Sequence, residues 1–205
     1  MIAIIDYGMG NVRSVRNALE YIGEDAVVTA DAVAIEHADR LILPGVGAFG
    51  DAMANLEARG LPRILSREVL ERRKPFLGIC LGLQLLAKTS AEHGRHVGLG
   101  WIDGEVLKFE PAVGRKVPHM GWHDVRRESP HPLLAGLRAD QLCFYFVHSF
   151  HLVCKAVGDV IATCHYGSPF TAAIARANIA AMQFHPEKSQ DNGVQVLKNF
   201  AIWKP

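Results

Sequence analysis

Short apolar runs alternate with amphipathic stretches along the first half of the chain. Continuous apolar runs fit strands buried on both faces, and we expect strands at residues 2–5, 27–28, 40–43 and 75–79. Between them, apolar residues recur at helical spacing. This spacing predicts a first helix that follows Asn11 and ends near Gly23, helical faces at residues 49–56 and 61–69, and a helix over 81–88. Such alternation is typical of βα units, which build parallel sheets.

The second half of the chain is richer in strand patterns. Strand-like segments occupy residues 104–109, 141–150 and 159–165, and residues 170–176 and 179–184 predict a hairpin that turns at Ala177 and Asn178. A C-terminal helix is expected over residues 191–203. With no repeat or linker, the pattern predicts an α/β fold: an open, mostly parallel sheet flanked by helices, with additional antiparallel strands in the second half. We expect one domain over residues 1–205.

Charge and hydropathy exclude several classes of function. Lys and Arg total 22 against 21 Asp and Glu in 205 residues, so no bulk basic field favours nucleic acid. The apolar stretches at residues 76–87 and 142–147 fall short of the roughly 20 residues that a membrane span needs. Residues 1–6 read as a strand rather than a secretory signal, and four cysteines are too sparse for a disulfide framework. We therefore expect a cytoplasmic protein that binds neither nucleic acid nor membrane.

Cys80 stands where a predicted buried strand meets a predicted helix, between Gly78 and Gly82. This is the arrangement of a nucleophile elbow, with sulfur in place of the serine oxygen. A thiol at a helix N-terminus is favoured as the thiolate, and the N–H of Leu81 can bind an oxyanion. The alternative is a small core cysteine, which would need neither glycine.

A cysteine nucleophile needs a base, and His185 follows a predicted buried strand in the segment Phe184-His185-Pro186-Glu187. In an extended segment, residues i and i+2 face the same side, so Glu187 could orient the imidazole. A surface loop is the alternative interpretation of this short segment.

Together these motifs resemble the class I (triad) glutamine amidotransferases. The resemblance rests on Gly-x-Cys-x-Gly-x-Gln at residues 78–84 and on Phe-His-Pro-Glu at residues 184–187. Four further motifs are similar to those of the glutaminase subunits of imidazole glycerol phosphate synthases, and they lie at residues 6–11, 44–49, 118–122 and 145–149. The similarity extends over essentially the whole chain and implies a flavodoxin-like fold.

The resemblance implies that Cys80 attacks the side-chain amide of glutamine, while His185 transfers protons and Glu187 orients the ring. A thioester would form and water would release glutamate. Val46 and Leu81 would supply the oxyanion-binding N–H groups. The family pattern also implies substrate contacts at Gly47, Gln84, Glu92, Ser149 and Phe150.

The resemblance further implies that ammonia passes to a (β/α)₈ cyclase subunit, which forms a heterodimer with this chain and makes imidazole glycerol phosphate and aminoimidazole carboxamide ribotide in histidine biosynthesis. Candidate interface residues, all expected in loops, are Asn11, Met120, Trp122, Tyr145 and Lys188. His123 stands where the family usually has asparagine. A paralogous subunit that supplies ammonia to another acceptor, such as a surface-polysaccharide sugar, is the alternative.

No cofactor or metal is expected. Gly8-x-Gly10 lacks the third glycine of a dinucleotide fingerprint, so it reads as a turn. Cys143, His148, His151 and Cys154 crowd one stretch, but their spacing matches no standard zinc motif. A cysteine peptidase would share the triad, although Gln84 and the family motifs argue against it. A noncatalytic regulatory subunit would need a broken triad, and this one is intact.

Overall fold

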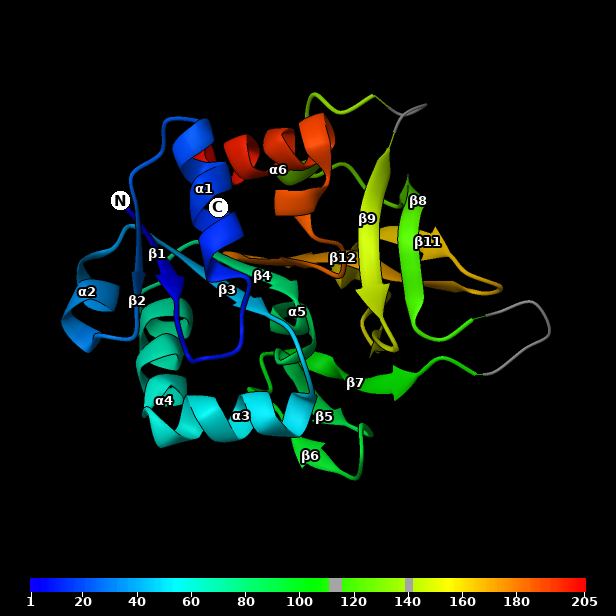
Figure 1. Ribbon diagram of the computed structural model, residues 1–205, viewed down its shortest axis with the longest axis horizontal. Helices are drawn as coiled ribbons and strands as arrows, with labels where there is room; N and C mark the ends of the chain where they lie inside the picture. The colour runs from blue at the N-terminus through cyan, green and yellow to red at the C-terminus, as the bar shows by residue number, and fades with distance from the viewer. Residues whose placement is uncertain (111–115, 139–141) are drawn as a thin grey trace.

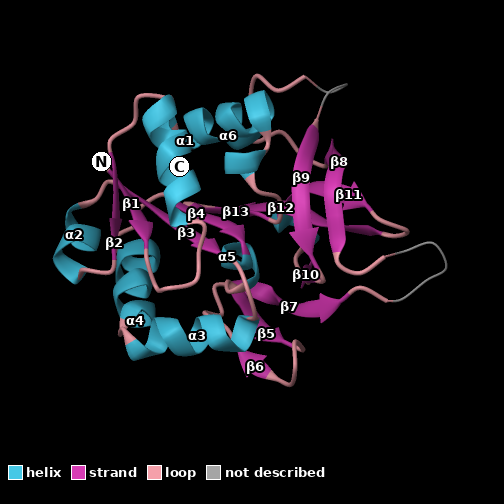
Figure 2. Ribbon diagram, in the orientation of Figure 1, coloured by secondary structure: helices cyan, strands magenta, loops and turns pink. Residues whose placement is uncertain are grey.

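The computed structural model describes residues 1–110, 116–138 and 142–205. Strands of these residues form two sheets, the larger in the order β2-β1-β3-β4-β13-β12-β11-β8-β9 and the smaller in the order β10-β7-β5-β6 (Figures 1 and 2). In sheet order, the larger sheet contains β2 (Ala26–Thr29), β1 (Ile2–Ile5), β3 (Arg40–Gly45), β4 (Phe76–Cys80), β13 (Ile179–Met182), β12 (Pro169–Arg176), β11 (Val160–His165), β8 (His119–Arg127) and β9 (Cys143–His148). The smaller contains β10 (Phe150–Cys154), β7 (Ile102–Lys108), β5 (Ala87–Ser90) and β6 (His96–Val97).

The larger sheet changes character at β13. From β2 to β13 every neighbouring pair is parallel, and from β13 to β9 every pair is antiparallel. The predicted fold class is therefore confirmed. The predicted hairpin is also confirmed, because Arg176 pairs with Ile179 across the turn. Ligands in open α/β sheets bind beyond the carboxyl ends of the parallel strands, so this edge is where a site is expected.

Helices cover both faces of the parallel strands, as Figure 1 shows: α1 (Val12–Tyr21) and α6 (Gln190–Ile202) on one face, α3 (Phe49–Ala58) and α4 (Leu61–Ser66) on the other. Alternate residues of β1 face the two layers. Ile2 and Ile4 pack in the cluster that holds the apolar residues of α1 and α6, whereas Ala3 and Ile5 pack in the cluster that holds those of α3 and α4. This two-sided burial explains the uninterrupted apolar run of β1.

The predicted helix over residues 81–88 is wrong in its second half. Helix α5 ends at Gln84 (Leu81–Gln84), and the next residues enter the smaller sheet as β5. Backbone hydrogen bonds from Leu99 to Leu85 and from Ile102 to Leu86 take the carbonyls that a longer helix would have used. Pairing with distant residues thus overrides the local helical pattern.

Other boundaries also differ from the sequence prediction. The strand expected over residues 141–150 divides at Ser149 into β9 and β10, which belong to different sheets, and Gln141 lies outside the described residues. Helix α2 (Ala32–His37) and strand β8 were not predicted. Among the described residues, no helix is long and apolar enough to span a membrane.

Candidate active site

Cys80 lies at the junction of β4 and α5, where the sequence places it. Its backbone has φ 53° and ψ −108°, which side-chain-bearing residues rarely adopt. A Cβ on Gly82 would fall 1.8 Å from the carbonyl oxygen of Leu43, and one on Gly78 would fall 2.7 Å from that of Gly82. Both glycines are therefore required by close backbone approach. Helix α5 has four residues, fewer than predicted, so its dipole is small and its free N–H groups matter more.

His185 and Glu187 meet, although not in the extended segment that the sequence suggested. Residues Pro186–Lys188 form a 3₁₀ turn, and His185 Nδ1 lies 2.8 Å from Glu187 Oε1. Because the Glu187 carboxylate accepts this hydrogen bond, His185 Nδ1 carries the hydrogen. His185 Nε2 is the ring nitrogen that Glu187 does not bind. Asn11 Nδ2 donates to the same Oε1 at 3.0 Å. Both members of the pair are buried, with side chains 1% and 0% exposed.

The charges around His185 favour its protonated form. Burial by itself lowers the pKa of His185, but hydrogen bonds and charges from Cys80 and Glu187 outweigh burial and raise it to about 10. Gln183 Nε2 donates to the sulfur of Cys80 at 3.6 Å. Cys80 and Glu187 thus flank the His185 ring, and both favour its protonated form.

A pocket of about 290 Å³ opens over Cys80. It brings together every catalytic, oxyanion and substrate residue predicted from the sequence except Glu187, which lies behind His185. The predicted residues that line it are Val46, Gly47, Cys80, Leu81, Gln84, Glu92, Ser149, Phe150 and His185. Val46, Cys80 and His185 lie at or just beyond the ends of β3, β4 and β13, at the carboxyl edge of the parallel strands. The other residues come from the segment after β3, from α5, from the segment after β5 and from the junction of β9 and β10.

Two of the predicted substrate residues also hold the walls of the pocket. Gln84 Nε2 donates to the carbonyl oxygen of Phe150 at 2.9 Å and to Gln183 Oε1 at 3.1 Å. Glu92 follows β5 rather than ending a helix, and its Oε2 accepts the N–H of Phe49 at 2.7 Å, at the first turn of α3.

Sequence reasoning missed Gln183 and Tyr7. Gln183 is a polar residue in the otherwise apolar run before His185, and that interruption could have marked it. Tyr7 is 1% exposed, and a Cβ on Gly45 would fall 2.5 Å from its hydroxyl oxygen. Burial and the charge of Cys80 raise the pKa of Tyr7, so its phenol stays neutral.

The candidate interface residues are not all in loops. Met120 and Trp122 lie on β8 and Tyr145 on β9, because the segment around them pairs as an antiparallel ladder in which Trp122 opposes Tyr145. Met120 and Trp122 are exposed, at 59% and 45%. Lys188 Nζ lies 5.7 Å from the centre of the Tyr145 ring. Asn11 precedes α1 without capping it, since its side chain turns to Glu187.

The cysteines and histidines considered as a metal site do not converge. His148 ends β9, whereas His151 and Cys154 lie on β10. Within residues 1–110, 116–138 and 142–205, no group of three or more His, Cys, Asp or Glu side chains is placed to hold a metal ion.

Comparisons with known proteins agree with this geometry. The chain is 51% identical over 209 residues to imidazole glycerol phosphate synthase subunit HisH 2 of Nitrobacter winogradskyi, covering 100% of this chain and 99% of the relative. It is 48% identical over 200 residues to the subunit HisH 2 of Pseudomonas aeruginosa, covering 98% of each. It is 52% identical over 199 residues to the subunit HisH of Moorella thermoacetica, covering 97% of this chain and 93% of the relative.

Solved structures share the fold at lower identity. A crystal structure described as a glutamine amidotransferase matches with a TM-score of 0.72 and 22% identity, covering 98% of this chain and 100% of that one. The structure of PurLQS from Thermotoga maritima matches with a TM-score of 0.74 and 21% identity, covering 98% and 96%. The family model "Glutamine amidotransferase class-I" matches residues 3–203. The chain therefore belongs to the class-I glutamine amidotransferase family.

Proposed function

We propose that the chain is the glutaminase subunit of an imidazole glycerol phosphate synthase and serves histidine biosynthesis. The observation that carries the proposal is Cys80 on its strained turn, in one pocket with a buried, carboxylate-bound His185. The names of relatives about half identical over essentially the whole chain support the assignment to this subunit.

In the proposed reaction, Cys80 Sγ attacks the side-chain carbonyl carbon of glutamine. The N–H groups of Leu81 and Val46 bind the oxyanion, and His185 gives its proton to the departing nitrogen, so that ammonia leaves and a thioester remains. His185 then takes a proton from water, which attacks the thioester and releases glutamate and the thiol. Glu187 keeps the imidazole oriented throughout.

Ammonia would be consumed by a (β/α)₈ cyclase subunit, the partner that we propose for a heterodimer. The exposed Met120 and Trp122, with Tyr145 and Lys188 beside them, support a docking face next to the pocket. Aromatic and long side chains of this kind are typical anchors of protein interfaces. Asn11 would act from inside the site rather than from the surface, because it is bonded to Glu187.

We also propose that residues 1–205 work as one domain in the cytoplasm. The pocket takes walls from both sheets, since Cys80 ends β4 of the larger sheet and Phe150 begins β10 of the smaller. The four cysteines are all free, which fits a reducing compartment.

The test measures glutamate release by the chain alone and with a cyclase subunit plus its nucleotide ligand. We expect low activity alone, strong stimulation in the complex and no turnover by Cys80→Ala. Cys154→Ala is the matched control, because Cys154 does not line the pocket. Turnover by Cys80→Ala would refute the mechanism. An active chain that no cyclase stimulates would refute the pathway and favour a paralogue that supplies another acceptor.

A further inference from the structure

Two buried histidines form a hydrogen-bonded pair beside the pocket. His119 begins β8 and His148 ends β9, and the two are paired across the antiparallel ladder. His119 Nδ1 lies 2.9 Å from His148 Nε2, and His148 Nδ1 lies 2.8 Å from the carbonyl oxygen of Phe150. The residues are 0% and 7% exposed. Both occur in motifs that the triad does not use.

The partners of the pair fix where its hydrogens lie. A carbonyl oxygen only accepts, so His148 Nδ1 carries a hydrogen and donates it to Phe150. When His148 is neutral its Nε2 is an acceptor, and His119 Nδ1 must then be the donor. His119 Nε2 is buried and has no hydrogen-bond partner among the described residues, which suits an unprotonated nitrogen. Burial is the main cause that lowers the pKa of His119 to about 4 and that of His148 to about 3. The bonds therefore run in one direction, from His119 through His148 to Phe150.

This chain of bonds ends on the wall of the substrate pocket. The Phe150 carbonyl accepts a second hydrogen bond from Gln84 Nε2 at 2.9 Å. The carbonyl of Ser149 accepts the N–H of Phe109 at 3.1 Å. Because peptide groups are planar, these bonds fix the peptide planes on both sides of Phe150. His148 therefore helps to fix the orientation of the backbone at residues 149–150, where that backbone forms part of the pocket wall. His148 itself also lines the pocket.

We propose that His119 and His148 are positioning residues for glutamine binding. His148 holds the Phe150 carbonyl, and with it the backbone at residues 149–150, in the orientation that the substrate head group meets. His119 holds His148 in the tautomer that can donate to that carbonyl; in the other tautomer, two acceptors would face each other. The inference rests on the proposed glutaminase function and concerns substrate affinity rather than the chemistry at Cys80.

The test uses paired amide variants in the complete enzyme with its cyclase partner. The amide nitrogen of asparagine can reach the position of Nδ1, whereas that of glutamine reaches Nε2. His119→Asn and His148→Asn therefore keep the donor that the chain of bonds needs, and His119→Gln and His148→Gln lose it. The free energy of one such bond corresponds to about a tenfold change in an affinity, so its loss should raise the KM for glutamine about tenfold. We expect that increase in both Gln variants, with kcat changed less than about twofold, and a KM close to wild type in both Asn variants.

Alkylation of Cys80 by iodoacetamide is measured alongside and is expected to proceed at the wild-type rate in all four variants. If a His119 variant does not fold, the His148 pair carries the comparison. Equal KM values for the Asn and Gln variants at either position would overturn the inference, as would a fall in kcat at constant KM. Absence of glutaminase activity in the wild-type complex would instead overturn the proposed function, so the two failures are distinguishable.

Discussion

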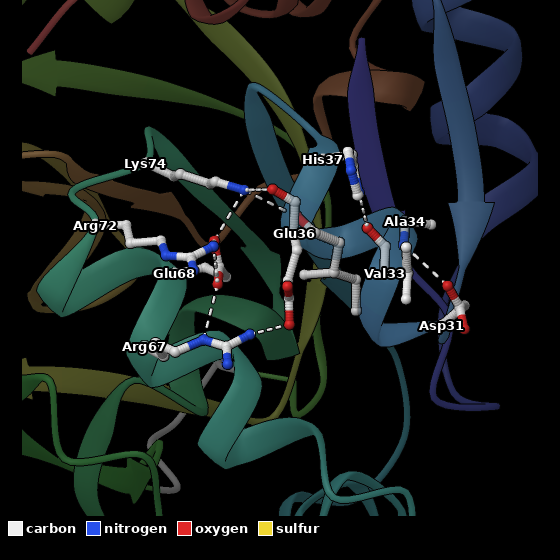
Figure 3. Close-up of polar contacts among 10 residues, drawn as sticks. Asp31, Val33, Ala34, Glu36, His37, Arg67, Glu68, Arg72 and Lys74 are labelled. Carbon is white, nitrogen blue, oxygen red and sulfur yellow. Dashed lines mark hydrogen bonds and ion pairs between the residues drawn. The ribbon is translucent and has the colours of Figure 1, made fainter.

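Replacement of Glu68, which does not line the pocket, by glutamine should destabilise the fold. Glu68 lies in the helical turn after α4, and its side chain is 0% exposed (Figure 3). Its carboxylate contacts Arg67 Nε at 3.0 Å, Arg72 at 3.1 Å and Lys74 Nζ at 2.9 Å. Lys74 also donates to the carbonyl oxygens of Ile35 and Glu36 at the end of α2, so the cluster joins two elements.

The expected loss of stability follows from the three charged hydrogen bonds that Glu68→Gln weakens. A hydrogen bond to a charged group contributes about 1 kcal/mol more than a neutral one, so three donors give about 3 kcal/mol. Arg67 and Arg72 are 40% and 50% exposed and regain water, whereas Lys74 is 14% exposed and does not. Discounting the two arginines, we expect Glu68→Gln to lower the free energy of unfolding by about 2 kcal/mol and Tm by about 4–8 °C.

The same carboxylate predicts a pH dependence. Burial alone raises the pKa of Glu68, but hydrogen bonds from Lys74 and Arg67, with the charges of Lys74 and Arg72, hold it below its ordinary value. A lowered folded-state pKa stabilises the fold above the unfolded pKa, about 4.3 for glutamate, and this stabilisation is lost as pH falls through the folded value. The difference between wild type and Glu68→Gln should therefore shrink below about pH 4.

Urea denaturation followed by circular dichroism at pH 7 and at lower pH provides the measurement. Glu36→Gln is the matched control: Glu36 pairs with the same Arg67 but is 33% exposed, so its loss should cost less than about 1 kcal/mol. Equal unfolding midpoints for wild type and Glu68→Gln at pH 7, or an equal loss in both variants, would refute the reasoning.

Three further substitutions test the packing around the elbow and the pocket. Gly82→Ala places a Cβ 1.8 Å from the Leu43 oxygen and should lower the free energy of unfolding, measured by urea denaturation, by more than about 3 kcal/mol. Gly158→Ala is the control: its Cβ meets no atom within 4 Å, so its free energy of unfolding should stay within about 0.5 kcal/mol of wild type. Similar losses in both variants would contradict the close approach at Gly82. Tyr7→Phe removes a buried hydroxyl with no hydrogen-bond partner among the described residues, so the free energy of unfolding should rise by about 1 kcal/mol. A clear fall in the free energy of unfolding would instead show that the hydroxyl has a partner. Glu92→Ala removes the acceptor at the first turn of α3 and should cost about 1 kcal/mol in the same assay, and no change would show that the bond to Phe49 is unimportant.

The fold was predictable where burial imposes a local pattern. Strands β1, β3 and β4 are buried on both faces, and their apolar runs mark them without help from the rest of the chain. Strand β5 was not predictable, because the apolar run around Leu85 and Leu86 suits a helix as well as a strand. The choice is made by backbone bonds to Leu99 and Ile102, which a local pattern does not contain.

The residues of the candidate site were likewise predictable where the constraint is local and not where it depends on distant residues. Cys80 and its two glycines were found because a tight turn restricts which residues can occupy neighbouring positions. Glu187 was found for a reason that the structure corrects: the residues between it and His185 form a turn, and the hydrogen bond is made across it. Gln183 and the His119–His148 pair were not assigned roles, since their bonds join residues 99 and 29 positions apart.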